Sequence, residues 1–297
     1  MTADISAARA FLVSQGRLLD RHRSDLIMGE GHADRALRAL EAHRNPDGGY
    51  GWSLEPDLRA PGSQPAGALH AFEVMAEVAP ATTPRAVELC DWLASVSLPD
   101  GGLPFALPIP DPTGTAPLWA EADNTTSSLQ ITSVVATVAH RVGRHDPAVA
   151  RHPWLAAATR YCLDQIAAVE RPETLFVLVL RYALWLLDAV VDTEPRAVAE
   201  MERLAAVIPP SGSLPVTGGA PDERMRPLDF TPLPDRPLRE LFAADAVSAD
   251  LDRLADEQHA DGGWDVDFAS YSPGAAREWR SYMTVWALSV LKANGRV

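Results

Sequence analysis

"RNPDGGYGW" covers residues 44–52, and its pattern of Asp-Gly-Gly followed by a large apolar residue occurs three times in the chain. The other two copies are "SLPDGGLPF" at 97–105 and "QHADGGWDV" at 258–266. In each copy a segment with helical spacing ends at the motif, a loop follows, and a new apolar helix begins. Glycines supply the positive φ that ends a helix, and the large apolar residue can pack back on that helix.

The three copies predict an internal repeat of helix, turn, loop and helix. The repeat units cover 31–79, 83–142 and 247–294, and a degraded fourth copy, "PSGSLPVTGG", lies at 210–219. Helix-pair repeats must stack to bury their apolar faces, and pairs that close on themselves surround a central cavity with two concentric rings. An ordinary helix stop would explain one copy, whereas three copies between helices favour the repeat.

Apolar residues spaced three and four positions apart predict an all-α protein. No segment keeps a sustained alternation of period two, so we expect few strands. The predicted helices cover 7–23, 33–44, 65–79, 84–96, 127–142, 154–169, 173–191, 195–208, 246–258 and 277–293. The long loops rich in Pro and Gly lack low-complexity repetition and the composition does not shift, so we predict one domain over 1–297.

The bulk composition limits the partners. The 297 residues are 47% hydrophobic, enough for a sizeable core, and the net charge of −14 would repel nucleic-acid phosphates and anionic membrane surfaces. The most apolar run, at 175–191, is interrupted by Arg181, so it predicts a buried helix rather than a transmembrane segment. No basic region leads into an apolar core at the start of the chain, so we expect a cytoplasmic protein.

The three motifs carry a family resemblance. "EAHRNPDGGYGW" (41–52), "SVSLPDGGLPF" (95–105) and "DEQHADGGWDV" (256–266) resemble the QW-type repeats of the terpenoid cyclase and protein prenyltransferase superfamily, which includes the squalene-hopene cyclases. The resemblance covers most of the chain and implies an α/α toroid of inner and outer helices, in which the repeat residues are structural. Family members usually place the active site between two toroid domains, so this chain would need a partner domain, a homodimer, or a pocket in its own barrel.

Zinc enzymes of this fold use Asp, Cys and His ligands, which the sequence does not offer in a suitable arrangement. Cys90 and Cys162 lie far apart in helical segments, and neither has the Asp-x-Cys setting of those ligands. His70, His140 and His145 fit core or surface positions better than metal ligands. We therefore expect two reduced thiols, no metal and no other cofactor.

Class II cyclases of the same superfamily protonate an alkene or epoxide with the middle Asp of an Asp-x-Asp-Asp-Thr motif. "WAEADNTTSSLQITSVV" at 119–135 resembles this motif, with Glu121 first, Asp123 in the middle, Asn124 third and Thr125 after it. The resemblance implies that Asp123 is the general acid. Glu121 and Asn124 depart from the family pattern.

Protonation of an alkene needs a carboxyl group that keeps its proton at rest and is still strongly acidic. Burial keeps the proton on, while a helix N-terminus and nearby donors stabilise the carboxylate that is left. Asp123, at the start of a helix predicted over 125–142, fits this role and equally fits a plain N-cap. Both interpretations stay open, and the enzymatic one requires Asp123 to be buried.

A cation formed in such a reaction would need aromatic faces and no nearby water. The aromatic residues in the loops, or on the helices that follow them, are the candidates for lining a substrate cavity: Trp52, Phe105, Trp119, Phe230, Trp264, Tyr282 and Trp286. Core packing explains each of them singly as well.

Further acidic residues fall in corresponding loops. "SLEPDLRAPGS" places Glu55, Asp57 and Arg59 after the first motif, at the point that corresponds to 121–124 after the second. Asp57 is thus a second candidate acid, and Arg59 could neutralise an acid or grip an anionic headgroup. The rest of this polar rim would be Asp229, Asp265, Asp267, Arg277 and Arg280. For Asp265 and Asp267 we prefer the interpretation of solvated loop acids.

Three hypotheses for function follow. The first is proton-initiated cyclisation of an isoprenoid-type alkene with Asp123 as general acid. The second is a non-catalytic toroid that binds a lipid, an isoprenoid or a protein partner, which the changes at Glu121 and Asn124 favour. The third is a carbohydrate-active (α/α) barrel with a carboxylate pair such as Asp57 and Asp123. We expect a small apolar, isoprenoid-like ligand.

Overall fold

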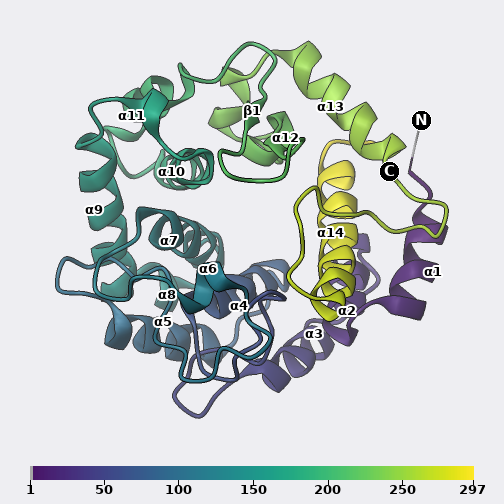
Figure 1. The fold of residues 1–297 in the computed structure, drawn as a ribbon, viewed down its shortest axis with the longest axis horizontal. Helices are drawn as coiled ribbons and strands as arrows, with labels where there is room; N and C mark the ends of the chain where they lie inside the picture. Colours follow the sequence, from purple (N-terminus) through teal and green to yellow (C-terminus); the bar gives the residue numbers. More distant parts are fainter. Residues whose placement is uncertain (1–2) are drawn as a thin grey trace. The chain divides into compact units, whose positions relative to one another are not determined.

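The computed structural model describes residues 3–297, and helices dominate its secondary structure (Figure 1). Two short strands, β1 (Leu214–Pro215) and β2 (Arg224–Met225), pair antiparallel with Leu214 opposite Met225. The prediction of an all-α protein with few strands is therefore confirmed. The chain divides into two compact units, residues 3–31 with 171–297 and residues 32–170, and each is described by itself. The single domain stays a prediction, since two compact units can belong to one domain or to two.

The unit of residues 32–170 is built around one central helix. Its helices are α3 (Ala33–Leu40), η1 (Glu41–His43), α4 (Pro65–Glu77), α5 (Pro84–Val96), α6 (Pro117–Ala120), α7 (Leu129–Gly143), α8 (Pro147–Ala150) and α9 (Pro153–Ala167). In Figure 1, α4 and α7 lie side by side, and α8 and α9 also contact α7. Every residue of α7 from Ile131 to Ala139 is buried, so this helix forms the core of the unit.

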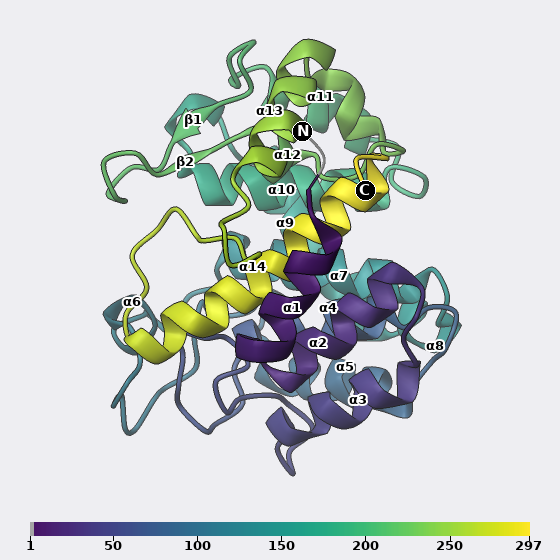
Figure 2. The ribbon, with the colours of Figure 1, turned by 90° about the vertical axis from the view of Figure 1, so that its right-hand side faces the viewer.

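The other unit joins the two ends of the chain. Its helices are α1 (Ile5–Gln15), α2 (Leu18–Met28), η2 (Pro172–Thr174), α10 (Val177–Val190), α11 (Ala197–Ala205), α12 (Pro227–Phe230), η3 (Pro237–Leu241), α13 (Ala244–Asp256) and α14 (Pro273–Ala293). Figure 2 shows α14 in yellow beside α1 and α2 in purple, and these helices are in contact. α10 contacts α11, α12 and η3.

The Asp-Gly-Gly motif forms the same turn in all three copies. The first glycine of each copy donates from its amide to the carbonyl three residues before it, at 2.8 to 3.1 Å: Gly48 to Asn45, Gly101 to Leu98 and Gly262 to His259. These glycines have φ between +90° and +95°, which strains any residue with a side chain. The aspartate of each motif accepts from the amide of the second glycine at 3.0 to 3.1 Å. The three motifs thus share one turn, whereas the helix-pair repeat stays a prediction.

The residue after each turn anchors it in the core. Tyr50, Leu103 and Trp264 are all buried at this position. The amide of Leu103 donates to Thr132 Oγ1 on α7 at 2.8 Å, and the amide of Trp264 donates to Thr284 Oγ1 on α14 at 3.1 Å. In the second and third copies the turn therefore attaches to an equivalent threonine of the helix that follows.

The degraded fourth copy keeps half of this turn. Gly212 has φ +69° and donates to the carbonyl of Pro209 at 2.7 Å, as the first glycine does in the other copies. In the other three copies the residue that accepts this bond also donates from its own amide to the carbonyl of the second glycine, at 2.8 to 2.9 Å, and Pro209 has no N–H with which to do so. The chain then continues into β1, β2 and the four-residue α12 rather than into a long helix.

Several predicted helix boundaries differ from the structure, and two of the differences have a clear local cause. The predicted helix 7–23 is divided into α1 and α2, because the backbone at Gly16 is extended, with ψ 150°. The helix predicted over 125–142 begins only at Leu129, where the Ser128 hydroxyl caps it by accepting from the amide of Ile131 at 3.4 Å.

Candidate functional site

Asp123 is an exposed loop residue and does not cap α7. One carboxylate oxygen accepts from the amide of Thr125 at 2.8 Å and from its hydroxyl at 2.6 Å, and the other accepts from the Thr126 hydroxyl at 2.6 Å. These hydrogen bonds, led by that of the Thr125 hydroxyl, lower the pKa of Asp123 to about 2. The burial that the enzymatic interpretation of Asp123 requires is therefore absent, and the N-cap interpretation is wrong as well, since neighbouring polar side chains hold the carboxylate in a solvated turn before α7.

The two positions that depart from the family motif are exposed as well. Glu121 follows the last residue of α6, and Asn124 lies in the loop before α7. The segment 121–126 is therefore a surface loop in the unit of residues 32–170, and it brings no buried acid to the site predicted there.

Hydrogen bonds fix the register between the first two loops. The hydroxyl of Ser63 donates to the aspartate of the first turn at 2.7 Å, and that of Ser127 donates to the aspartate of the second turn at 2.6 Å. Asp57 lies six residues before Ser63, and Glu121 lies six residues before Ser127. Counted from these serines, Asp57 corresponds to Glu121 rather than to Asp123, and Glu121 lies within the predicted correspondence with 121–124.

Glu55, His70 and Glu73 form a buried chain of charges in the same unit. His70 Nε2 lies 2.8 Å from Glu55 Oε2, and His70 Nδ1 lies 3.0 Å from Glu73 Oε2. Burial alone would lower the pKa of His70, but the carboxylates of Glu73 and Glu55 outweigh it and raise the pKa to about 9. His70 is therefore a cation at neutral pH, and each ring nitrogen donates to a carboxylate.

Asp57 joins this cluster through the backbone, and two loops meet there. Its amide donates to Glu55 Oε1 at 3.3 Å, and its carbonyl accepts from the amide of Ala116 at 2.8 Å. The Gln64 side chain donates to the carbonyl of Leu107 at 3.2 Å and accepts from its amide at 2.8 Å. The loops after the first and second motifs therefore meet, as expected. Asp57 is buried with 7% exposure, and Arg59 is half-buried.

Three of the predicted aromatic residues lie in these loops. Phe105 and Trp119 are half-buried and stack with their ring centroids 4.7 Å apart and their planes 14° apart. Trp52 is 54% exposed, and its Nε1 donates to Asn45 Oδ1 at 2.8 Å. Trp52 and Ser53 both have left-handed φ angles, of 51° and 58°, so the indole is presented by a strained turn.

The other four predicted aromatic residues belong to the unit of residues 3–31 and 171–297. Phe230 and Trp264 are core residues, at 0% and 1% exposure, and Trp264 Nε1 donates to the carbonyl of Leu254 at 2.7 Å. Tyr282 and Trp286 are half-buried on α14. The guanidinium of Arg23 lies 5.2 Å from the centre of the Tyr282 ring, so that ring already faces a cation of the protein.

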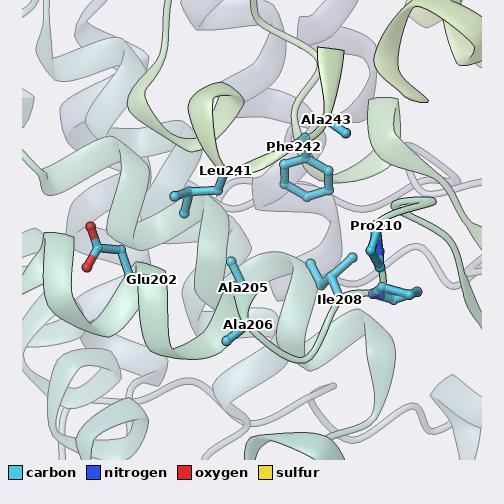
Figure 3. Close-up of a pocket in the computed structure, with 9 residues that line it drawn as sticks. Glu202, Ala205, Ala206, Ile208, Pro210, Leu241, Phe242 and Ala243 are labelled. Carbon is cyan, nitrogen blue, oxygen red and sulfur yellow. The ribbon is translucent and has the colours of Figure 1, made fainter. Parts of the chain in front are cut away.

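An open surface pocket of about 360 Å³ lies between α11 and η3, in the unit of residues 3–31 and 171–297 (Figure 3). It is lined by Glu202, Ala205, Ala206, Ile208, Pro209, Pro210, Leu241, Phe242 and Ala243. In Figure 3, Phe242 and Ile208 face each other across the pocket, and Glu202 lies at its edge. Small-molecule sites span roughly 300 to 1,000 Å³, so this pocket has room for a small ligand.

Sequence reasoning missed this pocket, because none of the predicted site residues lines it. Pro209 and Pro210 belong to the degraded fourth turn, and Phe242 stacks on the core residue Phe230 with ring centroids 5.7 Å apart. The available signal was the degraded motif itself. A repeat without its long helix leaves apolar side chains without the partner that covers them in the other copies.

The cysteines and metal-ligating residues form no separate centre. Burial raises the pKa of both Cys90 and Cys162 to about 12, so both are thiols at neutral pH. Among residues 3–297, no group of three or more His, Cys, Asp or Glu side chains is arranged to hold a metal ion.

No protein-family model matches the chain, and no curated protein matches it with statistical significance. The resemblance to the terpenoid cyclase and protein prenyltransferase superfamily therefore stays a prediction. In the described part of the chain, no helix combines the length and the apolar character that a membrane crossing requires.

Proposed function

We propose that the protein is a non-catalytic helical-repeat protein that binds a small apolar molecule, of isoprenoid type, in the α11–η3 pocket. The lining of this pocket carries the proposal. All of the lining residues except Glu202 are apolar, and Phe242 and Ile208 offer two facing apolar side chains. Transfer of an apolar chain from water into such a pocket is favourable by about 25 cal/mol for each Å² that is buried.

The state of Asp123 supports binding without catalysis. With a pKa of about 2 and a position exposed to water, its carboxylate is ionised at neutral pH and has no proton to give. His70 does hold a proton, but a pKa of about 9 makes it far too weak an acid to protonate an alkene. The cyclase hypothesis, which needs a strong acid facing an apolar cavity, is therefore the second choice.

The carbohydrate hypothesis receives less support. It needs two carboxylates that face an open cleft with room for a sugar between them. Asp57 is buried in the packed loops around His70, whereas Asp123 is exposed in a surface turn. One buried and one exposed carboxylate do not form such a pair.

We propose in addition that the helix pairs complete an α/α toroid. The support is the shared turn, with one hydrogen-bond pattern and one left-handed glycine in three places along the chain. Equivalent anchoring threonines in two of the copies, Thr132 and Thr284, favour the same repeating architecture.

The pocket proposal is tested by isothermal titration calorimetry with geraniol and farnesol. Ala205 lines the pocket, and Ala199 is exposed on the same helix outside it. We expect wild type and Ala199→Phe to bind one of the two alcohols with the same affinity. Ala205→Phe should bind at least about tenfold more weakly, because its ring fills the space that the ligand needs.

Equal affinity in Ala205→Phe, with both variants folded by circular dichroism, would contradict the pocket. Product analysis separates the two leading hypotheses. Linear prenyl substrates should be recovered unchanged after incubation with wild type. A cyclised product that Asp123→Asn no longer forms would instead establish the cyclase.

A further inference from the structure

α10 is the most apolar helix of the chain, and a single arginine stands in its middle. Arg181 is flanked by the buried residues Leu180 and Ala183, and the only other charged residue of the helix, Asp188, lies near its end. An arginine that is half-buried among apolar residues loses hydration, and proteins usually offset this loss with an ion pair. The contacts of Arg181 should therefore show what offsets its lost hydration.

Arg181 has no such ion pair within the described chain. Its single hydrogen bond runs from Nη1 to Met225 Sδ at 3.7 Å, and sulfur is a weak acceptor. Its Nε is buried and has no partner. Each of the arginines 17, 236 and 253 in the same unit donates to an aspartate at 2.6 to 2.9 Å. Apart from this weak bond to sulfur, Arg181 has no hydrogen bond in the described chain, although its charge attracts the buried Asp229.

Two aromatic rings hold this guanidinium by its face. Its central carbon lies 4.5 Å from the centre of the Trp185 ring and 5.3 Å from that of Tyr182. The indole is itself fixed, because Trp185 Nε1 donates to the carbonyl of Phe230 at 2.6 Å. Stacking uses the face of a guanidinium and leaves the in-plane N–H groups at its edge available. Those edge donors match the two oxygens of a carboxylate.

We propose that Arg181 anchors a binding site for a carboxylate that carries an apolar chain. The N–H groups on its two Nη atoms would hold the two oxygens, and Trp185, Tyr182 and Met225 would contact the chain. This site shares no residue with the α11–η3 pocket and does not depend on the function proposed for it.

The surrounding acids favour a singly charged ligand over phosphate. Burial raises the pKa of Asp229, Arg181 opposes this rise, and Asp250 and Asp267 add to it. Carboxylates near Arg181 repel a doubly charged phosphate more strongly than a singly charged ligand. A monoanion with an apolar tail fits both the charge and the neighbouring side chains.

Thermal shift and calorimetry with octanoate, octanol and inorganic phosphate test this site. Octanoate should raise the Tm of wild type, and neither octanol nor phosphate should do so. Arg181→Met should lose the octanoate effect, and Arg181→Lys should bind at least about tenfold more weakly, because an ammonium lacks the planar fork. Ala205→Phe should bind octanoate as wild type does, which separates this site from the pocket.

The stability of the variants distinguishes a binding role from a structural one. Without ligand, Arg181→Met should lose less Tm than Arg236→Met, because Arg181 has no short ion pair and only attracts the buried Asp229 from further away. Arg236→Met is the matched control and should have a lower Tm, since it leaves Asp188 without the arginine that lies 2.9 Å away. No octanoate effect on wild type, or an equal effect on Arg181→Met, would overturn the proposal, as would tighter binding of phosphate than of octanoate.

Discussion

The buried His70 makes the stability of the protein depend on pH in a defined window. His70 is 5% exposed and is held between Glu55 and Glu73, which raise its pKa from the ordinary 6.5 to about 9 despite burial. A group whose folded pKa is raised contributes stability that is complete below pH 6.5 and is lost as the pH rises through 9. At about 1.4 kcal/mol for each factor of ten in proton affinity, the contribution is roughly 3 kcal/mol.

The variant His70→Gln tests this contribution, because glutamine can donate a hydrogen bond but cannot carry the charge. Urea unfolding followed by circular dichroism gives the free energy of unfolding of wild type and variant at pH 6 and at pH 10. We expect the gap between the two proteins to be roughly 3 kcal/mol larger at pH 6 than at pH 10. Titration of all other groups is shared by the two proteins and largely cancels in the gap.

His140 is the matched control with the opposite sign. Burial lowers its pKa to about 4, and its Nε2 lies 2.8 Å from Thr159 Oγ1. The wild type should therefore lose stability relative to His140→Gln as the pH falls from 6.5 towards 4. A gap between wild type and His70→Gln that does not change between pH 6 and pH 10 would refute the proposed charge on His70.

The remaining predictions concern the repeat and the exposed loop. Gly262→Ala should lower the free energy of unfolding in urea by about 3 kcal/mol or more, since φ is +93° and a Cβ would lie 2.1 Å from the carbonyl oxygen of Ala7. Gly218→Ala, with φ +82° and open space around it, should lower it by only about 1 to 2 kcal/mol. Thr132→Val and Thr284→Val should each lower the free energy of unfolding by about 1 to 3 kcal/mol, because each leaves a buried backbone amide without its acceptor. Unequal losses in the two variants would argue against equivalent anchoring. Asp123→Ala should leave the Tm and ligand binding unchanged, and a lost activity would contradict its role as a surface turn residue.

The helices and their repeat could be predicted from the sequence because both depend on local chemistry. The segment 84–96 is predicted and observed with the same bounds, and all three Asp-Gly-Gly motifs adopt one turn. The errors occur where a local signal has two interpretations. Gly16 divides a continuous helical pattern, and the run Asp123–Ser128 offers several possible caps, of which Ser128 is the one used.

The candidate sites were harder to predict because they depend on contacts between distant residues. Burial of Glu55 and Asp57 results from packing between two loops, through Ala116 and Leu107, which no motif encodes. Arg181 was visible as an interruption of an apolar run, but its missing ion pair is a property of the folded protein. The α11–η3 pocket is lined partly by Pro209 and Pro210 beside the degraded copy, and the sequence showed only that this copy is degraded.

A crystal structure of the protein soaked with geraniol or farnesol would test the central claim most directly. We predict electron density for an intact prenyl chain between Phe242 and Ile208, beside Ala205, with Asp123 remote from any ligand atom. Density for a cyclised product, or a prenyl chain bound elsewhere while the α11–η3 pocket stays empty, would contradict it.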